Sequence, residues 1–479
     1  MTQGRGEHSL SRSISSLQYF TLAFGCVVGV AWMIILGDIV SKAGPGGAAL
    51  ALAIGGAGVL LVAFCYAEVA GVRPHAGGEL VYAYELGGSG ASFAIGWTLT
   101  LLYVATCAFE AISIGAVTNM LFPGVTGPLL YTLFGQEVRL GAVVIGLVFA
   151  LLLWLLNVRG AKMSARTQEW TTYLRLLLMA GFLGVAVFYA HPANLKPLFT
   201  FGHSSLAATQ FFGVLATAPF WYGGFTVFAT ASEETATSMR MVGRAIVFSI
   251  VAAGLFYIAL ILSIGALTPW HNLAAMKLPA AEAFTAAMGT PIVAKIVLAT
   301  ALLGNLTAWN ALLLAGSRVL FAMGRAGLSA GAFARVHPRF RTPSFAVAFV
   351  SVISIAVLFL GRGFITPLVN VSSACFSLTY LVTCLTLIRL RRVEPGTERP
   401  YRAPGGAGMA WIASLVSLAI LAVTLVQPWL AAGDRIPPEW ITLGGWAGLG
   451  LVFWFAATRA RRRIAEPARR AILTGSAET

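Results

Sequence analysis

The architecture of this chain follows from two short stretches, Gly25-Cys26-Val27-Val28-Gly29 and Pro219-Phe220-Trp221-Tyr222-Gly223-Gly224, each of which interrupts a long apolar segment. Proline lacks the backbone N–H that a helix needs, and glycine lowers helix propensity by about 1 kcal/mol. Unpaired backbone is tolerated at membrane depth only where protein or a wet cavity surrounds it. If these segments span a membrane, the two breaks therefore predict a central cavity, although glycine pairs also permit close helix packing.

The composition places the chain in a lipid bilayer. Its 479 residues are 58% hydrophobic and only 10% charged, whereas a soluble globular chain has about 25% charged residues. Since one crossing takes about 20 apolar residues, we expect an all-α integral membrane protein with twelve transmembrane helices, and not a secreted or peripheral protein. The expected segments are 18–40, 47–71, 92–120, 140–157, 169–190, 208–231, 245–267, 292–321, 343–361, 364–388, 408–429 and 440–458.

The net charge of +15, from 32 Lys and Arg against 17 Asp and Glu, has a topological explanation. With the amino terminus inside, 24 basic residues fall on the cytoplasmic side, seven on the outer side and one, Arg175, within the membrane, as the positive-inside rule requires. We therefore expect a multi-pass protein of the cell membrane with both termini cytoplasmic, and no nucleic-acid partner. The five cysteines lie in apolar segments and the six histidines in the amino-terminal tail or in or near loops, so no cofactor or metal site is expected.

The two breaks fall in the first and sixth segments, which are corresponding positions in two five-segment halves. Paired interruptions of this kind indicate an inverted-repeat transporter that binds its substrate at the membrane midplane. No phosphate-binding loop is evident, so transport is expected to run on gradients and not on nucleotide hydrolysis. The chain is not expected to be an enzyme.

Six motifs follow one another along the chain. They are Cys65-Tyr66-Ala67-Glu68-Val69-Ala70, Pro74-His75-Ala76-Gly77-Gly78-Glu79-Leu80-Val81-Tyr82, Asn157-Val158-Arg159-Gly160-Ala161-Lys162, Ser317-Arg318-Val319-Leu320-Phe321-Ala322-Met323-Gly324-Arg325-Ala326-Gly327, His337-Pro338 with Thr342-Pro343, and Arg399-Pro400-Tyr401-Arg402-Ala403-Pro404. In this order they resemble the amino acid–polyamine–organocation (APC) superfamily of permeases. The resemblance covers most of the chain, from the first helix to the loop before the eleventh.

The resemblance implies an inverted repeat of helices 1–5 and 6–10 with broken helices 1 and 6, peripheral helices 11 and 12, and alternating access. The domains would then be a cytoplasmic tail at 1–17, the two repeats at 18–190 and 208–388, the peripheral helices at 408–458, and a basic cytoplasmic tail at 459–479.

The resemblance also implies a substrate site made of main chain. Unwound helix 1 would offer N–H groups to a carboxylate, and unwound helix 6 would offer carbonyls to an amino group, in agreement with the polarity of helix ends. Phe220 or Trp221 would be an aromatic gate over the substrate, unless these rings only pack in the bundle. The residues that match the site are Cys26, Val27, Val28, Gly29 and Val30 for the carboxylate, and Ala218, Pro219, Phe220, Trp221 and Gly223 on helix 6.

Arg175 stands in the fifth segment where many relatives look to have lysine. In related sodium-coupled transporters a cation sits between helices 1, 5 and 8, and the family's lysine is thought to stand in for it. Because a guanidinium keeps its charge where a buried lysine can lose it, we expect Arg175 to be a fixed cation, and transport to be independent of sodium.

Glu110 is the other ionisable residue deep in an apolar segment, and such residues are costly and usually functional. It could bind the amine of a substrate, titrate as a proton site, or form a structural ion pair with Arg175. Glu233 and Glu234 follow the sixth segment and are expected to pair with Arg240 or Arg244.

Three functions remain open from the sequence. The first is a secondary transporter that moves amino acids by exchange or proton coupling. The second is a permease of the same fold for amines such as polyamines or ethanolamine, which Glu110 favours. The third is a membrane receptor or scaffold that does not transport. In the first two, the partners are a small-molecule substrate and the bilayer.

Overall fold

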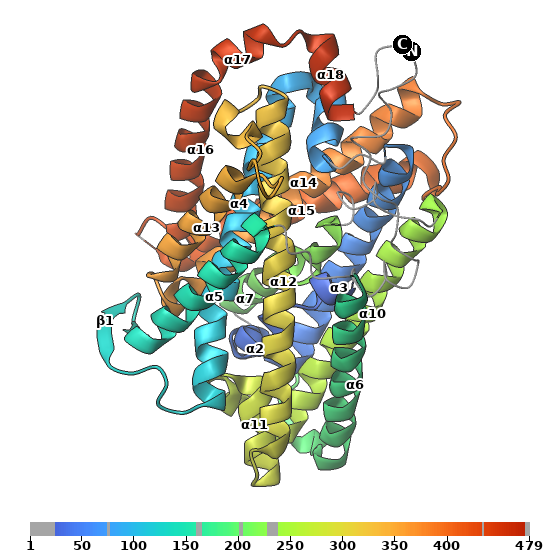
Figure 1. Cartoon of the computed structure of the whole chain (residues 1–479). Helices are drawn as coiled ribbons and strands as arrows, with labels where there is room; N and C mark the ends of the chain where they lie inside the picture. Colours follow the sequence, from blue (N-terminus) through green and yellow to red (C-terminus); the bar gives the residue numbers. More distant parts are fainter. Residues whose placement is uncertain are drawn as a thin grey trace.

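The computed structural model describes residues 24–73, 77–159, 165–200, 205–227, 238–433 and 435–474, which form a bundle of long helices (Figure 1). Eight of their helical segments are long and apolar enough to cross a bilayer. They are α3 (Leu36–Val72), α4 (Glu79–Leu121), α5 (Leu140–Arg159), α6 (Ala165–Tyr189), α10 (Met239–Leu267), α12 (Ile292–Arg325), α14 (Ile365–Val393) with the turn η6 (Arg362–Phe364), and α15 (Gly406–Ala432). A mainly helical, multi-pass membrane protein is thereby confirmed.

Four expected segments do not meet this criterion of length and hydropathy within the described residues. They are Phe24–Ile34, which ends in α2 (Ala31–Ile34), the pair α7 (Ser205–Ala216) and α8 (Ala218–Tyr222) followed by η2 (Gly223–Thr226), α13 (Ser344–Leu358), and α16 (Pro438–Ala456). Two of the four are the segments with the breaks. The count of twelve crossings and the inverted repeat therefore stay predictions.

The structure adds a short β-hairpin, which was not expected, between the third and fourth segments. There β1 (Leu129–Leu133) and β2 (Gln136–Arg139) pair antiparallel around a two-residue turn, Phe134-Gly135, in which both residues have positive φ. Two positive φ values suit a turn that matches the natural twist of a hairpin. The hairpin is too short and too exposed to show in a search for long apolar runs.

Glycines bend two of the long helices. In α3 the chain turns at Gly44, with φ +73°, so that the first two expected segments run into one another through the Gly44-Pro45 turn. In α4 the kink lies at Gly87-Gly88, and the helix begins at Glu79 and not near residue 92 as expected. Glu79 is consequently a buried residue in the first turn of α4.

The core of the bundle is built by α3 against α10 and by α4 against both α12 and α14. Figure 1 shows α12 running along most of the bundle beside α4, α6 and α11. The remaining elements are the turns η1 (Pro192–Leu195), η4 (Trp270–Ala274) and η5 (Gly331–Ala334) and the helices α11 (Pro279–Met288), α17 (Thr458–Arg463) and α18 (Glu466–Thr474). The predicted tail at 1–17 and the pair Glu233-Glu234 lie outside the described residues.

Candidate functional site

The first break lies at Val28-Gly29-Val30. Helical turns flank it, since Val28 N–H donates to Phe24 O at 2.9 Å and α2 starts at Ala31. Within the break, Gly29 N–H reaches only Val27 O, at 3.2 Å, in a tighter turn than an α-helix makes. Val27, Val28 and Val30 are buried, whereas Cys26 and Gly29 keep some exposed surface. The accessible surface of this stretch therefore lies at Cys26 and Gly29.

Arg175 of α6 binds the carbonyl side of this break. Its guanidinium donates to Gly25 O at 3.3 Å and to Val28 O, and the residue is 3% exposed. On α12, a Cβ at Gly304 would lie 2.7 Å from Arg175 Nη2, so a larger residue there would displace the guanidinium. The structure thus places the guanidinium of Arg175, a residue of α6, between the first break and α12.

The sixth segment is interrupted less sharply than the first. α7 ends at Ala216, Thr217 intervenes, α8 follows with Pro219 near its start, and the chain then tightens into the 3-10 turn η2. A proline near the start of a helix costs the helix little stability, because the first backbone N–H groups of a helix have no partner within it. The described residues of this segment end at Val227.

Gly224 brings the two interrupted segments into direct contact. A Cβ at Gly224 would lie 2.2 Å from Cys26 O and 2.7 Å from Val27 N, which no side chain can occupy. Gly223 is equally confined, because a Cβ there would lie 2.3 Å from the ring of Phe376 on α14. Gly224 thus allows η2 to pack on the backbone of the first interrupted segment, and Gly223 allows it to pack on α14.

Tyr257 of α10 links the same two segments and was not singled out from the sequence. Its hydroxyl lies 2.9 Å from Val27 O and 3.0 Å from Trp221 O. A hydroxyl has one proton, so it donates to one of these carbonyls at a time. The sequence signal for this role was only that Tyr257 is a single tyrosine in the apolar seventh segment. The partners of its hydroxyl depend on how the helices pack.

The two aromatic candidates for a gate differ in exposure. Phe220 keeps some accessible surface and meets Phe109 of α4 edge to face, at 5.0 Å between ring centres. Trp221 is 1% exposed and packs against Tyr257 at 4.9 Å. Ala218 and Pro219 are buried, and Ala218 lies against Gly55 of α3. Phe220 is thus the candidate with a ring that borders accessible space.

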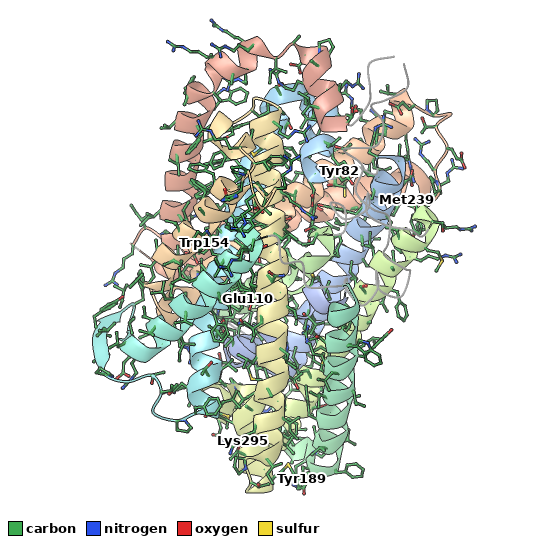
Figure 2. All side chains as sticks on the ribbon, in the orientation of Figure 1. Tyr82, Glu110, Trp154, Tyr189, Met239 and Lys295 are labelled. Atoms are coloured by element: carbon green, nitrogen blue, oxygen red, sulfur yellow. The ribbon has the colours of Figure 1, made fainter. Side chains whose placement is uncertain are left out.

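Glu110 lies midway along the bundle, between Tyr82 toward one end and Lys295 at the other (Figure 2). A Cβ at Gly29 would be 3.3 Å from Glu110 Oε1, so this carboxyl group borders the first break. Oε2 is buried without a hydrogen-bond partner. The ion pairs found within the described residues do not include one between Glu110 and Arg175.

A second buried carboxyl group lies on the same helix, away from the break. Glu79 Oε1 accepts a hydrogen bond from Tyr66 at 3.2 Å, and Oε2 has no partner. Tyr66 in turn packs edge to face on Phe225 of η2, at 5.1 Å. In the part of the chain that the structure describes, no three His, Cys, Asp or Glu side chains gather as possible metal ligands.

Comparison with known proteins gives the family of this chain. The family model described as amino acid permease matches residues 18–458, so the chain belongs to the amino acid permease family. Its relatives, like the family, are transporters and not enzymes.

Three relatives illustrate the range of similarity. The chain is 28% identical to the branched-chain amino acid permease BcaP of Bacillus subtilis (strain 168), with 96% of each chain covered. It is 28% identical to a methylthioribose transporter of the same strain, over 83% of this chain and 85% of the relative. It is 23% identical to a D-serine/D-alanine/glycine transporter of Escherichia coli O6:H1, over 94% and 96% of the two chains.

Proposed function

We propose that this protein is a secondary active transporter that moves amino acids across the cell membrane by alternating access. The family and the amino acid permeases among the relatives support this cargo. Transport would proceed by exchange or proton coupling, with the two halves at 18–190 and 208–388 moving relative to one another and 408–458 at the periphery. Both termini would face the cytoplasm.

The observation that carries the proposal is the first break itself, with Arg175 on one side of it and Gly224 on the other. Val28 N–H and Gly29 N–H already donate to Phe24 O and Val27 O, so the N–H of Val30, beside the accessible surface at Gly29, would be the group of the break offered to a carboxylate. Carbonyls of Ala218 to Trp221 and the carboxyl group of Glu110 would receive the amine, with Phe220 closing over the substrate. Trp221 would support Phe220 from behind.

We infer that transport does not need sodium. Arg175 donates to two carbonyls of the break, which are the kind of oxygen that binds an alkali cation. A sodium ion there would face a permanent positive charge in a medium of low dielectric constant, which is strongly unfavourable. The guanidinium also remains charged over the whole physiological pH range.

The test is uptake of radiolabelled amino acids by purified protein in liposomes, with sodium replaced throughout by choline. We expect saturable uptake at the same rate in both salts. A pH gradient and an internal pool of unlabelled substrate, imposed separately, distinguish proton coupling from exchange. Uptake that stops when sodium is removed contradicts the assignment of Arg175, and liposomes without any flux point to the receptor or scaffold.

An amine without a carboxylate is the second candidate, and the position of Glu110 beside Gly29 favours it. A carboxyl group at the break would compensate the charge of a cationic substrate. Competition decides between the two: decarboxylated amines that displace the ligand better than amino acids do would establish the amine permease. Because one relative is a methylthioribose transporter, the panel also includes that thiosugar.

A further inference from the structure

Two adjoining cavities lie at the start of α10, on the face that the basic residues assign to the cytoplasm. One, of about 540 Å³, is lined by Arg240, Arg244, Arg399, Arg402 and Tyr401 with two prolines of the same loop. The other, of about 450 Å³, is lined by apolar side chains of α10, among them Phe248 and Val251. Arg244 and Tyr401 line both. A strongly basic cavity thus opens beside an apolar one.

The loop that forms the basic cavity is firmly held. Glu68 of α3 is fully buried and accepts hydrogen bonds from Arg391, from Arg399 and, at 2.7 Å, from the backbone N–H of Ala403. The ring of Tyr401 packs on α10 at Gly243, where a Cβ would approach it to 2.7 Å. The wall of the cavity is therefore a fixed part of the bundle.

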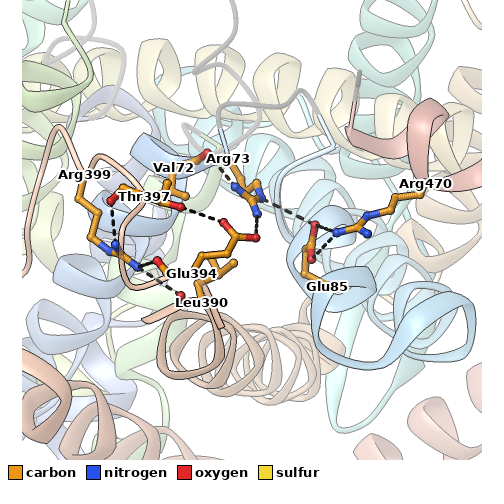
Figure 3. A network of polar contacts seen from close by, with 8 residues as sticks. All are labelled: Val72, Arg73, Glu85, Leu390, Glu394, Thr397, Arg399 and Arg470. Atoms are coloured by element: carbon orange, nitrogen blue, oxygen red, sulfur yellow. Dashed lines mark hydrogen bonds and ion pairs between the residues drawn. The ribbon is translucent and has the colours of Figure 1, made fainter. Parts of the chain in front are cut away.

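Three of the four arginines have no acidic partner among the described residues. The fourth, Arg399, is paired with Glu68 at 3.0 Å. Its guanidinium also donates to the backbone carbonyls of Thr397, Leu390 and Glu394 (Figure 3). Arg240, Arg244 and Arg402 are exposed, and no ion pair or hydrogen bond of their side chains occurs within the described part of the chain. Glu233 and Glu234, which the sequence offers as partners, lie outside it.

The position along α10 matches the boundary between head groups and acyl chains. The 29 residues of α10 span about 43 Å at 1.5 Å per residue, whereas the hydrocarbon core is about 30 Å thick. Arg240 and Arg244 lie in its first two turns. They share one face of the helix because they are four positions apart. Phe248 and Leu255 continue that face, exposed by 60% and 66%. The charged end therefore lies at head-group depth and the apolar face beside the acyl chains.

We propose that this is a binding site for an anionic phospholipid, with its phosphate between Arg240, Arg244 and Arg402 and an acyl chain along Phe248 and Val251. Arginine is the residue that best matches phosphate, because its planar fork donates two parallel hydrogen bonds. Basic pockets between helices at the cytoplasmic surface bind anionic head groups. A bound lipid would connect α10 to the loop that Glu68 anchors.

The test uses native mass spectrometry of the full-length protein in detergent with phosphatidylglycerol and phosphatidylcholine in competition. We expect the wild type to retain phosphatidylglycerol. The double variant Arg240→Gln/Arg244→Gln should bind this lipid about 25-fold more weakly, because each basic side chain that is removed lowers the affinity about fivefold. The matched control is Arg462→Gln/Arg463→Gln, which removes the same charge from two exposed arginines of α17. It should bind like the wild type.

Three results of the lipid competition overturn the proposal. They are equal retention of the two lipids by the wild type, undiminished retention by Arg240→Gln/Arg244→Gln, and an equal loss in the control variant, which would show a general charge effect. Soluble glycerol 3-phosphate that displaces the lipid at similar concentration would also overturn it, because the site would then recognise a free phosphate. Intact circular dichroism of each variant verifies that the exposed substitutions leave the fold unchanged.

Discussion

At the scale of single residues, Arg175 has the most demanding environment. Its guanidinium is buried against Gly304 and bound to two carbonyls of a broken helix, while its Nε has no partner. A buried charge with so few hydrogen bonds is costly. We expect the charge of Arg175 to hold the carbonyl side of the break in place during transport.

Substitution of Arg175 by Gln should abolish uptake in liposomes and lower the free energy of unfolding by about 1–3 kcal/mol, since carbonyls at the break lose their donor. Arg175→Lys, which keeps a charge but not the planar fork, should retain part of the activity. Thermal unfolding and initial uptake rates measure the two effects. Wild-type transport by Arg175→Gln would show that the fixed cation has no role.

The two buried carboxyl groups of α4 give a matched pair of variants. Glu110→Gln should lower uptake at least tenfold, because its carboxyl group borders Gly29, and it should alter the dependence of uptake on pH. Glu79→Gln should transport like the wild type, because an amide oxygen can still accept the hydrogen bond from Tyr66. Uptake is measured from pH 5 to 8 for both. Normal transport by Glu110→Gln at every pH removes Glu110 from the site.

At the scale of elements, the contact between η2 and the first break depends on the absence of side chains. Such close approach of two backbones is a recognised use of glycine in membrane proteins. The contact also explains why two interruptions far apart in the sequence form one feature in space. Movement of either segment must then disturb the other.

Gly224→Ala should abolish transport and destabilise the protein by about 1–3 kcal/mol, because the new methyl group would overlap Cys26 O. The control is Gly184→Ala on α6, where no atom lies within 4 Å of the added Cβ and where alanine favours the helix. Uptake and thermal unfolding are compared for the two variants. A fully active Gly224→Ala protein would mean that the two segments do not pack as described.

The last helix, α18, is held to α4 by hydrogen bonds to the carboxyl group of Glu466. Tyr84 donates to Glu466 Oε1 at 2.6 Å, Ser89 lies 3.2 Å away, and Arg469 pairs with Glu466 Oε2. The hydrogen bond from Tyr84, with the neighbouring Arg469, holds the pKa of the Glu466 carboxyl group below its ordinary value. The carboxylate form therefore stabilises the docked helix.

This contribution is complete above the ordinary glutamate pKa of about 4.3 and is lost as the pH falls through the lowered value. We expect residues 466–474 to exchange amide hydrogens at one slow rate from pH 7 to 5, and faster below about pH 4, after correction for intrinsic rates. Glu466→Gln should exchange faster at neutral pH already. The prediction is wrong if α18 detaches between pH 7 and 5 in the wild type.

At the scale of the whole molecule, ion pairs tie together several helix ends at one side of the bundle. Arg73 at the end of α3 pairs with Glu394 after α14, at 2.6 Å, and lies 3.7 Å from Glu85 of α4. Glu85 also contacts Arg470 of α18 at 3.5 Å (Figure 3). These helix ends therefore face the same side of the membrane.

We predict that this side is the cytoplasm and that the β1–β2 turn lies outside. Cysteine introduced by Gly135→Cys should react with an impermeant maleimide in intact cells, and Arg470→Cys only after the membrane is opened. The five native cysteines are mostly buried, which keeps the background low. Labelling of position 470 from outside would reverse the assigned orientation.

The differences between expectation and structure have particular causes. The β hairpin was missed because its strands have only five and four residues and are largely exposed. The start of α4 at Glu79, and not near residue 92, was missed because the charged residues Glu79 and Glu85 interrupt the apolar run. Both depend on what packs nearby, which hydropathy along the chain does not describe.

The membrane class, the positions of the breaks and the unusual Arg175 were determined by the sequence alone, because hydropathy, proline, glycine and charge act locally. Only the tertiary structure decided that Tyr257 joins the two interrupted segments, that Gly224 meets Cys26, that Glu110 borders Gly29 without pairing with Arg175, and that arginines from α10 and a distant loop line one cavity. These contacts join residues far apart in the chain, and their distances follow from helix packing, which local periodicity does not specify.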